Sequence, residues 1–238
     1  MRIKTAVQPD DGDFGLRNRW LDGLRRTVVF RTWKLIRRAQ PAAKRAMDLC
    51  VSSLMLLFLS PFFLLIAASI KLTDLGPVLF WQDRVGKFGK TFRFPKFRSM
   101  VMNAEALQRE LDAQNQHGSG VTFKMKRDPR ITWIGRIIRR ASIDELPQLW
   151  CVLKGEMSLV GPRPPLVREV ARYSVADRRR LEAIPGLTCF WQVQGRSEIP
   201  FPRQVELDVE YIENQSLALD VKLLAKTVPA VIGGRGAY

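Results

Sequence analysis

The chain has 238 residues and a formal net charge of +16, because 39 Lys and Arg residues outnumber 23 Asp and Glu residues. Its single histidine, His117, excludes histidine-rich zinc sites and the two-histidine helix of metalloproteases. The three scattered cysteines imply no disulfide framework. The excess charge requires an anionic partner: nucleic acid, an acidic membrane surface or a phosphorylated substrate.

Residues 1–41 are expected to form an amino-terminal extension. Residues 26–38 combine one apolar helical face with basic flanks, which is typical of a helix that lies in a membrane interface. That face consists of Val29, Phe30, Trp33 and Ile36. A surface helix packed on the domain is the alternative, and the apolar run that follows favours the membrane.

The segment from Leu49 to Ile70 contains no charged residue and is long enough for a membrane helix, which needs about 20 apolar residues. A buried core helix is disfavoured because the segment is apolar on all sides. Ser60-Pro61 lies in its middle and predicts a kink or break. Both flanks are basic, and positive charge favours the cytoplasmic side. Residues 42–72 are therefore predicted to be a re-entrant hairpin broken at Ser60-Pro61, with a spanning helix as the alternative.

Residues 73–238 are expected to form a small cytosolic catalytic domain with interfacial helices. Aromatic and β-branched residues at 78–84 and 91–98 predict a β-hairpin. The intervening Gly86–Thr91 ends like a phosphate-binding loop, but Arg84 stands where that motif needs its first glycine. Helices are predicted at 99–114, 142–154, 165–182, 203–215 and 217–228, and an extended segment is predicted at 188–194.

The segment from Arg139 to Pro147 holds two adjacent acidic residues behind two arginines. Ser142 and Glu145 have the spacing of a capping box, although Pro147 argues for a later cap or an irregular helix start. The same segment suits catalysis, because a helix start and guanidinium groups favour an ionised carboxylate and bind phosphate. Asp144 could then be a nucleophile in phosphoryl transfer, and Glu145 could hold Mg²⁺. Capping and catalysis remain alternatives at this point.

A proline-rich segment around Arg163 would present its guanidinium to a phosphate in a fixed pose, or it is a plain loop with a solvated arginine. The domain holds more cations than one ligand needs, and about a third of them are expected to touch it. The cations considered are Lys96, Arg98, Arg130, Arg139, Arg163 and Arg196.

The ordered motifs in residues 42–238 resemble the bacterial sugar transferase family, the monotopic phosphoglycosyl transferases. The motifs are Lys44-Arg45-x-x-Asp48, Ser60-Pro61, Lys96-Phe-Arg98-Ser-Met, Asp128-Pro-Arg130-Ile-Thr132, Ser142-Ile-Asp144-Glu145-Leu-Pro-Gln148, Ser158-Leu-Val-Gly-Pro-Arg163-Pro164, Pro185-Gly-Leu-Thr188, Trp191-Gln-Val-x-Gly195-Arg196 and Gly-Arg-Gly-Ala-Tyr238. The last three resemble the exopolysaccharide branch. Gln215 departs from it, since that branch often has tryptophan there.

The resemblance implies transfer of sugar-1-phosphate from a UDP-sugar, with an unmodified hexose favoured, to a polyprenyl phosphate such as undecaprenyl phosphate. UMP would be released, in the first membrane step of exopolysaccharide or surface glycan synthesis. Asp144 would form a covalent phospho-sugar intermediate, and Glu145 with Asp144 would hold Mg²⁺. Arg163 would contact the nucleotide, and the other substrate-binding residues would be Lys96, Arg98, Arg139 and Arg196.

The sequence thus predicts an α+β, predominantly helical protein with a re-entrant helix, located at the bacterial inner membrane with its catalytic domain on the cytoplasmic face. Expected partners are a UDP-sugar, polyprenyl phosphate and anionic lipids, and a homodimer is left open. Nucleic acid is not expected, because no recognition motif for it is present. A basic nucleic-acid-binding scaffold and a single-span protein with an external domain are the competing hypotheses.

Overall fold

The computed structural model of the chain describes residues 12–111, 125 and 128–233. Within them the fold is mostly helical, with two small two-stranded sheets, which agrees with the predicted predominance of helix. The helices are α1 (Gly12–Asp74), α2 (Ala104–Leu111), α3 (Trp133–Arg140), α4 (Leu149–Lys154), α5 (Val167–Val170), α6 (Phe190–Gln194), α7 (Phe201–Asn214) and α8 (Leu217–Gly233). The strands are β1 (Leu79–Val85), β2 (Thr91–Phe97), β3 (Ser158–Val160) and β4 (Gly186–Thr188), and 3₁₀ helices cover Lys87–Gly89, Ile143–Gln148, Asp177–Glu182 and Arg196–Glu198.

The chain divides into two compact units, Met1–Lys44 and Arg45–Tyr238. From Gly12 onward the first unit is helical and belongs to α1. The apolar face predicted for residues 26–38 rests on side chains outside the described ones, and His117 is also outside them. The domain boundaries predicted after residues 41 and 72 stay predictions.

The segment of α1 from Ala39 to Thr73 is long and apolar enough to cross a membrane. Only 11% of the most apolar stretch within this segment is buried. A helix in the core of a soluble protein would be mostly buried. The helix continues through Ser60 and Pro61, where a break was predicted. Pro61 has no N–H for the carbonyl oxygen of Leu57, one helical turn earlier. The Ser60 hydroxyl donates a hydrogen bond to that oxygen at 2.8 Å and so supplies the missing donor.

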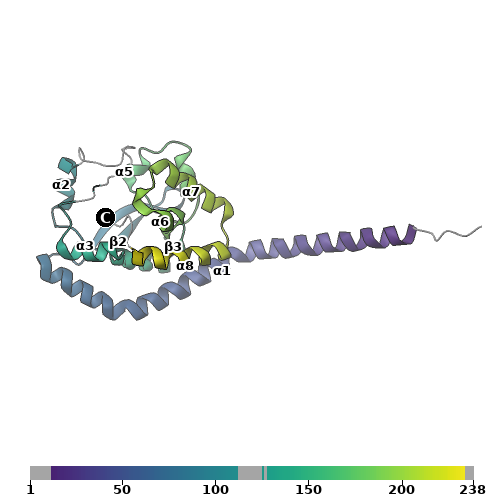
Figure 1. Cartoon of the computed structure of the whole chain (residues 1–238), viewed down its shortest axis with the longest axis horizontal. Helices are drawn as coiled ribbons and strands as arrows, with labels where there is room; N and C mark the ends of the chain where they lie inside the picture. Colours follow the sequence, from purple (N-terminus) through teal and green to yellow (C-terminus); the bar gives the residue numbers. More distant parts are fainter. Residues whose placement is uncertain (1–11, 112–124, 126–127, 234–238) are drawn as a thin grey trace, which may run out of the picture. The chain divides into compact units, whose positions relative to one another are not determined.

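Both halves of this apolar segment pack against the rest of the second unit, to which they belong. Met55 packs against its main hydrophobic core, and Ile66 and Ile70 belong to a second core cluster. Leu57 and Phe58, which lie between these contacts, are 68% and 75% exposed. Figure 1 shows the blue part of α1 bending away from the rest of this unit and back toward it. The structure therefore has a bend in a continuous helix where a kink or break was predicted.

Two charged residues one turn apart attach α1 to the rest of the second unit. The Arg45 guanidinium donates hydrogen bonds to two carbonyl oxygens in the last turn of α4, at 2.6 and 2.8 Å. Asp48 is buried, and its Oδ1 accepts hydrogen bonds from the Ser158 hydroxyl at 3.1 Å and the Leu159 amide at 3.0 Å. Arg45 thus adds hydrogen bonds to carbonyl groups at the carboxyl-terminal end of α4, and Asp48 fixes α1 to β3.

The predicted β-hairpin is confirmed, since β1 and β2 pair antiparallel. Lys96 lies opposite Phe80, and Arg84 lies opposite Phe92. Because side chains on a strand alternate between its faces, Phe80, Arg84 and Lys96 share one face of the hairpin. The glycines between the strands form the turn, where the Gly86 amide donates to the Lys90 carbonyl at 2.7 Å. This segment is therefore a hairpin turn and not a phosphate-binding loop.

The second sheet places the segment that carries Arg163. Strands β3 and β4 run parallel, and the amide of Gly161 donates to the Thr188 carbonyl at 3.0 Å. The amide of Gly186 donates to the carbonyl of Pro162 at 2.9 Å. A Cβ atom on Gly161 or Gly186 would collide with backbone atoms of the opposite segment. Glycine is required at both positions because the two backbones cross at close contact.

The helix predictions for 203–215 and 217–228 are confirmed by α7 and α8. Only α2 occupies the described part of 99–114. The single helix predicted for 165–182 is wrong, because the structure has the short α5 and a separate 3₁₀ helix there. Between them, Asp177 accepts hydrogen bonds from the amide and the hydroxyl of Ser174, both at 2.8 Å. Such side-chain bonds compete with continuous helix.

The prediction for 188–194 is wrong from Phe190 onward, because Phe190–Gln194 forms helix α6 in place of extended chain, whereas Thr188 belongs to strand β4. Trp191 is buried there in a cluster with Cys189 and Leu207. Packing against α7 therefore overrides the strand preference of its aromatic and β-branched residues. The helix predicted for 142–154 is divided into a 3₁₀ helix and α4.

The attachment of α1 through Asp48 can be tested by substitution. Asp48→Ala leaves two buried donors without an acceptor, so we expect the free energy of unfolding to fall by about 3 kcal/mol. Asp48→Asn keeps an oxygen acceptor and should lose less. Urea unfolding of the detergent-solubilised protein would measure both variants. Equal losses in the two variants would contradict the acceptor function of Asp48.

Candidate active site

A cavity of about 1470 Å³ in the second unit holds the residues that the sequence marked as catalytic or substrate-binding. Its walls come from the β1–β2 hairpin, the 3₁₀ helix Ile143–Gln148, the segment after β3, and helices α6 and α8. The predicted residues that line it are Lys96, Arg98, Arg139, Asp144, Glu145, Arg163 and Arg196. Ligand pockets usually have volumes of about 300–1,000 Å³, so this cavity has room for more than one substrate.

A strained turn brings the two acidic residues into the cavity. Ser142 adopts the left-handed conformation with φ of 55°, and its side chain makes no capping hydrogen bond. The capping-box interpretation of Ser142 and Glu145 is therefore wrong. The chain continues as a 3₁₀ helix that contains Pro147, and α4 starts only at Leu149. The irregular helix start that Pro147 indicated is confirmed. A left-handed residue other than glycine is unfavourable and occurs mostly at functional sites.

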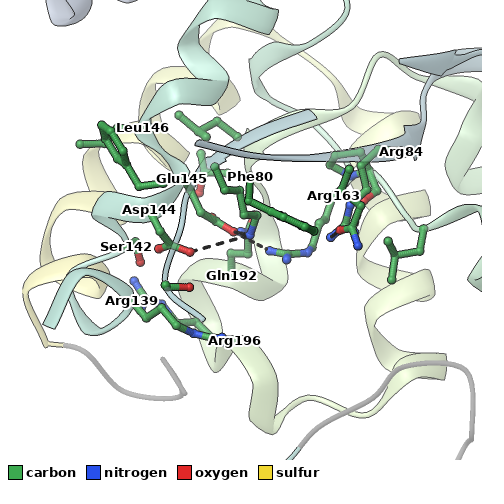
Figure 2. A pocket seen from close by; sticks show the side chains of 18 of the residues that line it. Phe80, Arg84, Arg139, Ser142, Asp144, Glu145, Leu146, Arg163, Gln192 and Arg196 are labelled. Atoms are coloured by element: carbon green, nitrogen blue, oxygen red, sulfur yellow. Dashed lines mark hydrogen bonds and ion pairs between the residues drawn. The ribbon is translucent and has the colours of Figure 1, made fainter. Parts of the chain in front are cut away.

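Glu145 is held by two cations. Its Oε1 accepts a hydrogen bond from the Lys96 ammonium at 2.8 Å and one from the Arg163 guanidinium at 3.2 Å. Figure 2 shows the side chains of Glu145 and Arg163 pointing toward one another. Burial alone would raise the pKa of Glu145, but Lys96 and Arg163 hold this pKa well below its ordinary value. Glu145 is therefore an ionised carboxylate whose charge is balanced within the protein.

Asp144 has a different environment although it is the adjacent residue. It is only 7% exposed, and its nearest cation is the Lys96 ammonium at 4.0 Å. Burial raises the pKa of Asp144 above its ordinary value, and the charge of Glu145 adds to this effect. Lys96 and Arg139 oppose it. The site thus contains two carboxyl groups whose pKa values are moved in opposite directions, as in enzymes that give neighbouring carboxylates different functions.

The remaining predicted cations surround this pair at longer range. Arg139, in the last turn of α3, and Arg196 line the same cavity (Figure 2). Burial lowers the pKa of Arg196, which Glu145 partly offsets. The guanidinium of Arg98 lies against Gly76, where it would collide with any added Cβ. Arg98 therefore lines the cavity with its guanidinium against the backbone of Gly76.

Arg130, considered as a ligand-binding cation from the sequence, is committed to the protein itself. Its guanidinium donates to Asp128 at 2.9 and 2.6 Å, and burial leaves both side chains almost inaccessible. The nearby Thr132 hydroxyl accepts from the Gly135 amide at 3.0 Å and caps α3. These contacts give the motif from Asp128 to Thr132 a structural explanation: its side chains bond to one another and cap the start of α3.

Sequence reasoning missed Arg84 as a residue of the cavity wall and treated it as part of a basic flank. Its guanidinium is buried, donates to the Pro164 carbonyl at 3.1 Å and to Gln82 at 2.8 Å, and lies over the ring of Phe94. Burial and the nearby Arg163 lower the pKa of Arg84 to about 10. Phe80, Gln82 and Arg84 stand at alternate positions of β1 and so lie on one face of the strand. This spacing could have identified Arg84 as a residue of the cavity wall.

The two carboxylates fit the magnesium ion that the sequence resemblance implies. Within the described residues, no group of three or more His, Cys, Asp and Glu side chains is placed to hold a metal ion. Magnesium does not need such a group, since one or two carboxylates together with substrate phosphates suffice. Lys96 and Arg163 both contact Oε1 of Glu145. Its Oε2 and the Asp144 carboxylate are left as oxygen ligands.

The chain is similar to known proteins over most of its length. Residues 39–234 match the family described as bacterial sugar transferase. The chain is 43% identical over 212 residues to the galactosyl transferase CpsE of Streptococcus agalactiae, covering 89% of this chain and 47% of CpsE. It is 39% identical over 199 residues to the exopolysaccharide production protein ExoY of Sinorhizobium fredii, covering 82% of this chain and 88% of ExoY. It is 43% identical over 208 residues to the undecaprenyl-phosphate galactose phosphotransferase of Salmonella typhimurium, covering 86% of this chain and 43% of that protein.

The chain spans most of the length of ExoY and less than half of the other two relatives. The matched residues include the apolar segment of α1, the hairpin that carries Lys96, and the turn that carries Asp144 and Glu145. On the extent of this match, the chain belongs to the bacterial sugar transferase family.

Proposed function

We propose that this protein transfers sugar-1-phosphate from a UDP-sugar to undecaprenyl phosphate and releases UMP, as a first membrane step in exopolysaccharide or surface glycan synthesis. The observation that carries the proposal is the Asp144–Glu145 pair, with Asp144 buried and Glu145 partly buried, surrounded by cations in a cavity large enough for two substrates. Relatives with 43% and 44% identity are named undecaprenyl-phosphate galactose and glucose phosphotransferases, which supports a hexose donor.

In the proposed reaction, a carboxylate oxygen of Asp144 attacks the phosphorus that bears the sugar. The bond from this phosphorus to the bridging oxygen breaks, and UMP leaves with that oxygen. A phosphate oxygen of the polyprenyl phosphate then attacks the same phosphorus and displaces Asp144. The products are the polyprenyl diphosphate sugar and the original carboxylate. A covalent nucleophile usually accelerates a reaction in this way, because it replaces one difficult step by two easier displacements.

In this proposal the cations bind the phosphate groups of the donor. Lys96 and Arg163 stand beside the carboxylates and would bind the diphosphate of the donor, while Arg139 and Arg196 contribute positive charge at longer range. Glu145 keeps Lys96 and Arg163 in place through its two hydrogen bonds. A bound Mg²⁺, held by Asp144 and Glu145, would neutralise charge on the phosphate oxygens during transfer.

The membrane arrangement is also part of the proposal. We place the bent apolar segment of α1 as a re-entrant helix in the bacterial inner membrane, with the catalytic unit on the cytoplasmic face. Both halves of the bent segment pack against the same unit, which supports this topology. On α3, Trp133 and Ile137 are 63% and 55% exposed and lie one turn apart, and Trp150 on α4 is 54% exposed. Exposed tryptophans on a basic helix suit contact with the membrane interface and its anionic lipids.

Asp144→Asn should remove the nucleophile while keeping the size of the side chain. We expect UMP release to fall by about a thousandfold or more.

The assay measures UMP released from UDP-galactose, UDP-glucose and N-acetylated UDP-sugars, with undecaprenyl phosphate and Mg²⁺. Glu206→Gln, at a carboxylate with 63% side-chain exposure, is the matched control and should remain active. Full activity of Asp144→Asn would refute the nucleophile, and no UMP release by the unaltered protein would refute the reaction.

Thermal unfolding shows whether Asp144→Asn is still folded. Because the pKa of Asp144 is raised in the folded state, stability falls as the pH rises from the ordinary aspartate value through the raised one. The variant has no such loss, so its unfolding midpoint at neutral pH should equal or exceed that of the unaltered protein. A lower midpoint would mean that its inactivity has a structural cause.

The pH dependence of the rate follows from the same shift. Asp144 must be ionised to attack, and burial raises its pKa above the ordinary value of 3.8. UMP release should therefore decline as the pH falls, with a midpoint above 3.8. Glu145 remains ionised throughout because its cations lower its pKa. A rate that stays constant down to the ordinary aspartate pKa of 3.8 would contradict this assignment.

The re-entrant topology can be tested by cysteine labelling. Ala46 and Leu75, at the two ends of the bent segment, are both exposed, and the exposed Cys50 is first replaced by serine. Ala46→Cys and Leu75→Cys should both resist a membrane-impermeant maleimide in intact cells and both react in inverted membrane vesicles. Reaction of one position from each side would instead indicate a spanning helix.

A further inference from the structure

The cavity has an apolar wall that the proposed chemistry does not use. On α8, Leu224, Thr227, Val228 and Val231 line the cavity. Their spacing of three, four and seven residues places them on one face of the helix. Leu224 also packs against the hydrophobic core, while Val228 is 60% exposed. This face therefore leads from the interior of the unit to an opening near the carboxyl-terminal part of α8.

A second helix face borders the same cavity. Val51 and Met55 on α1 line it and are four residues apart, so they project from one side of α1. Leu159 of β3 and Leu187 of β4 also line the cavity. All four residues belong to or pack against the hydrophobic core cluster that Leu224 contacts. The apolar part of the cavity is thus bordered by α1, α8 and the small parallel sheet.

The hydroxyl groups in this region are already used within the protein. The Thr227 hydroxyl donates to the Leu223 carbonyl at 2.8 Å. Thr188 and Thr227 are joined by a hydrogen bond of 2.8 Å, in which Thr188 must then be the donor. Neither threonine has a hydroxyl proton left for a ligand. A sugar or a nucleotide base would lose hydrogen bonds to water here without replacement, whereas a hydrocarbon chain would lose none.

The other part of the same cavity is cationic, with Lys96 and Arg163 at the carboxylates. A ligand that suits both parts has a phosphate head and a hydrocarbon tail. The UDP-sugar has no such tail. The wall made by α1 is also part of the segment that is long and apolar enough to enter a membrane, so a tail beside it would pass directly into the bilayer.

We propose that the apolar faces of α1 and α8 form the groove that holds the first isoprene units of the polyprenyl phosphate acceptor. This proposal rests on the proposed function, and it adds the residues by which the acceptor's tail is bound. The groove consists of Val51, Met55, Leu224, Thr227, Val228 and Val231. Its position lets the lipid phosphate reach the carboxylates while most of the chain stays in the membrane.

Val228→Trp tests the groove, because a bulky ring at an exposed position fills the opening without disturbing the core. We expect the KM for undecaprenyl phosphate to rise by about tenfold while the KM for the UDP-sugar stays unchanged. Val221→Trp is the matched control: it makes the same substitution on the same helix, at a valine that is 53% exposed and outside the cavity lining. It should leave both constants unchanged.

An unchanged acceptor KM in Val228→Trp, or an equal rise in the donor KM, would overturn the groove. A second measurement does not depend on turnover: native mass spectrometry of the detergent-solubilised protein with undecaprenyl phosphate. Val228→Trp should weaken this binding at least tenfold and Val221→Trp should not; equal binding by both overturns the groove. Loss of the proposed function looks different, since the unaltered protein would then release no UMP at all, whatever its affinity for the lipid.

Discussion

The double hydrogen bond from Lys96 and Arg163 to Glu145 is the interaction on which the arrangement of the site depends. The two cations come from parts of the chain far apart in sequence, and each needs its own backbone arrangement. Lys96 is positioned by the pairing of β2 with β1, and Arg163 by the close backbone contact of Gly161 with Gly186. Because Lys96 and Glu145 are largely buried and Arg163 is partly buried, removing Glu145 would leave two neighbouring cations without their shared carboxylate, which is strongly unfavourable. The hairpin, the turn and the small sheet therefore act as one frame.

A second constraint comes from the attachment of an apolar helix to this frame. Arg45 and Asp48 hold α1 to α4 and β3 through hydrogen bonds to backbone groups. Farther along α1, Ser60 supplies the donor that Pro61 lacks, which matters where no water can replace it. The bend can thus exist without an unsatisfied carbonyl group. As a result, the two ends of the bent segment of α1 pack against the core and the cavity, while its middle remains exposed.

Local patterns in the sequence predicted the elements whose stability is local. The hairpin follows from strand residues around two glycines, and α7 and α8 follow from helical periodicity. The missed elements depend on contacts that no local pattern contains. Helix α6 forms because Trp191 is buried against α7, and the left-handed Ser142 is held by the surrounding fold. In the same way, the sequence marked Lys96, Asp144, Glu145 and Arg163, but it could not show that Arg84 lies buried beside Arg163.

The distribution of charge explains how the site is prepared for anions. Arg84 and Arg163 are two guanidinium groups close enough for one to lower the pKa of the other. Arg84 is buried and the Arg163 side chain is 32% exposed, so an incoming phosphate meets cations that have lost much of their hydration on folding. The same burial disfavours the ionised form of Asp144, because the nearest cations are already engaged by Glu145. In the proposed reaction, the burial that favours phosphate binding by these cations also raises the pKa of the proposed nucleophile, Asp144. Placing the fully ionised Glu145 next to Asp144 ensures that the cations stay in position whichever protonation state Asp144 adopts.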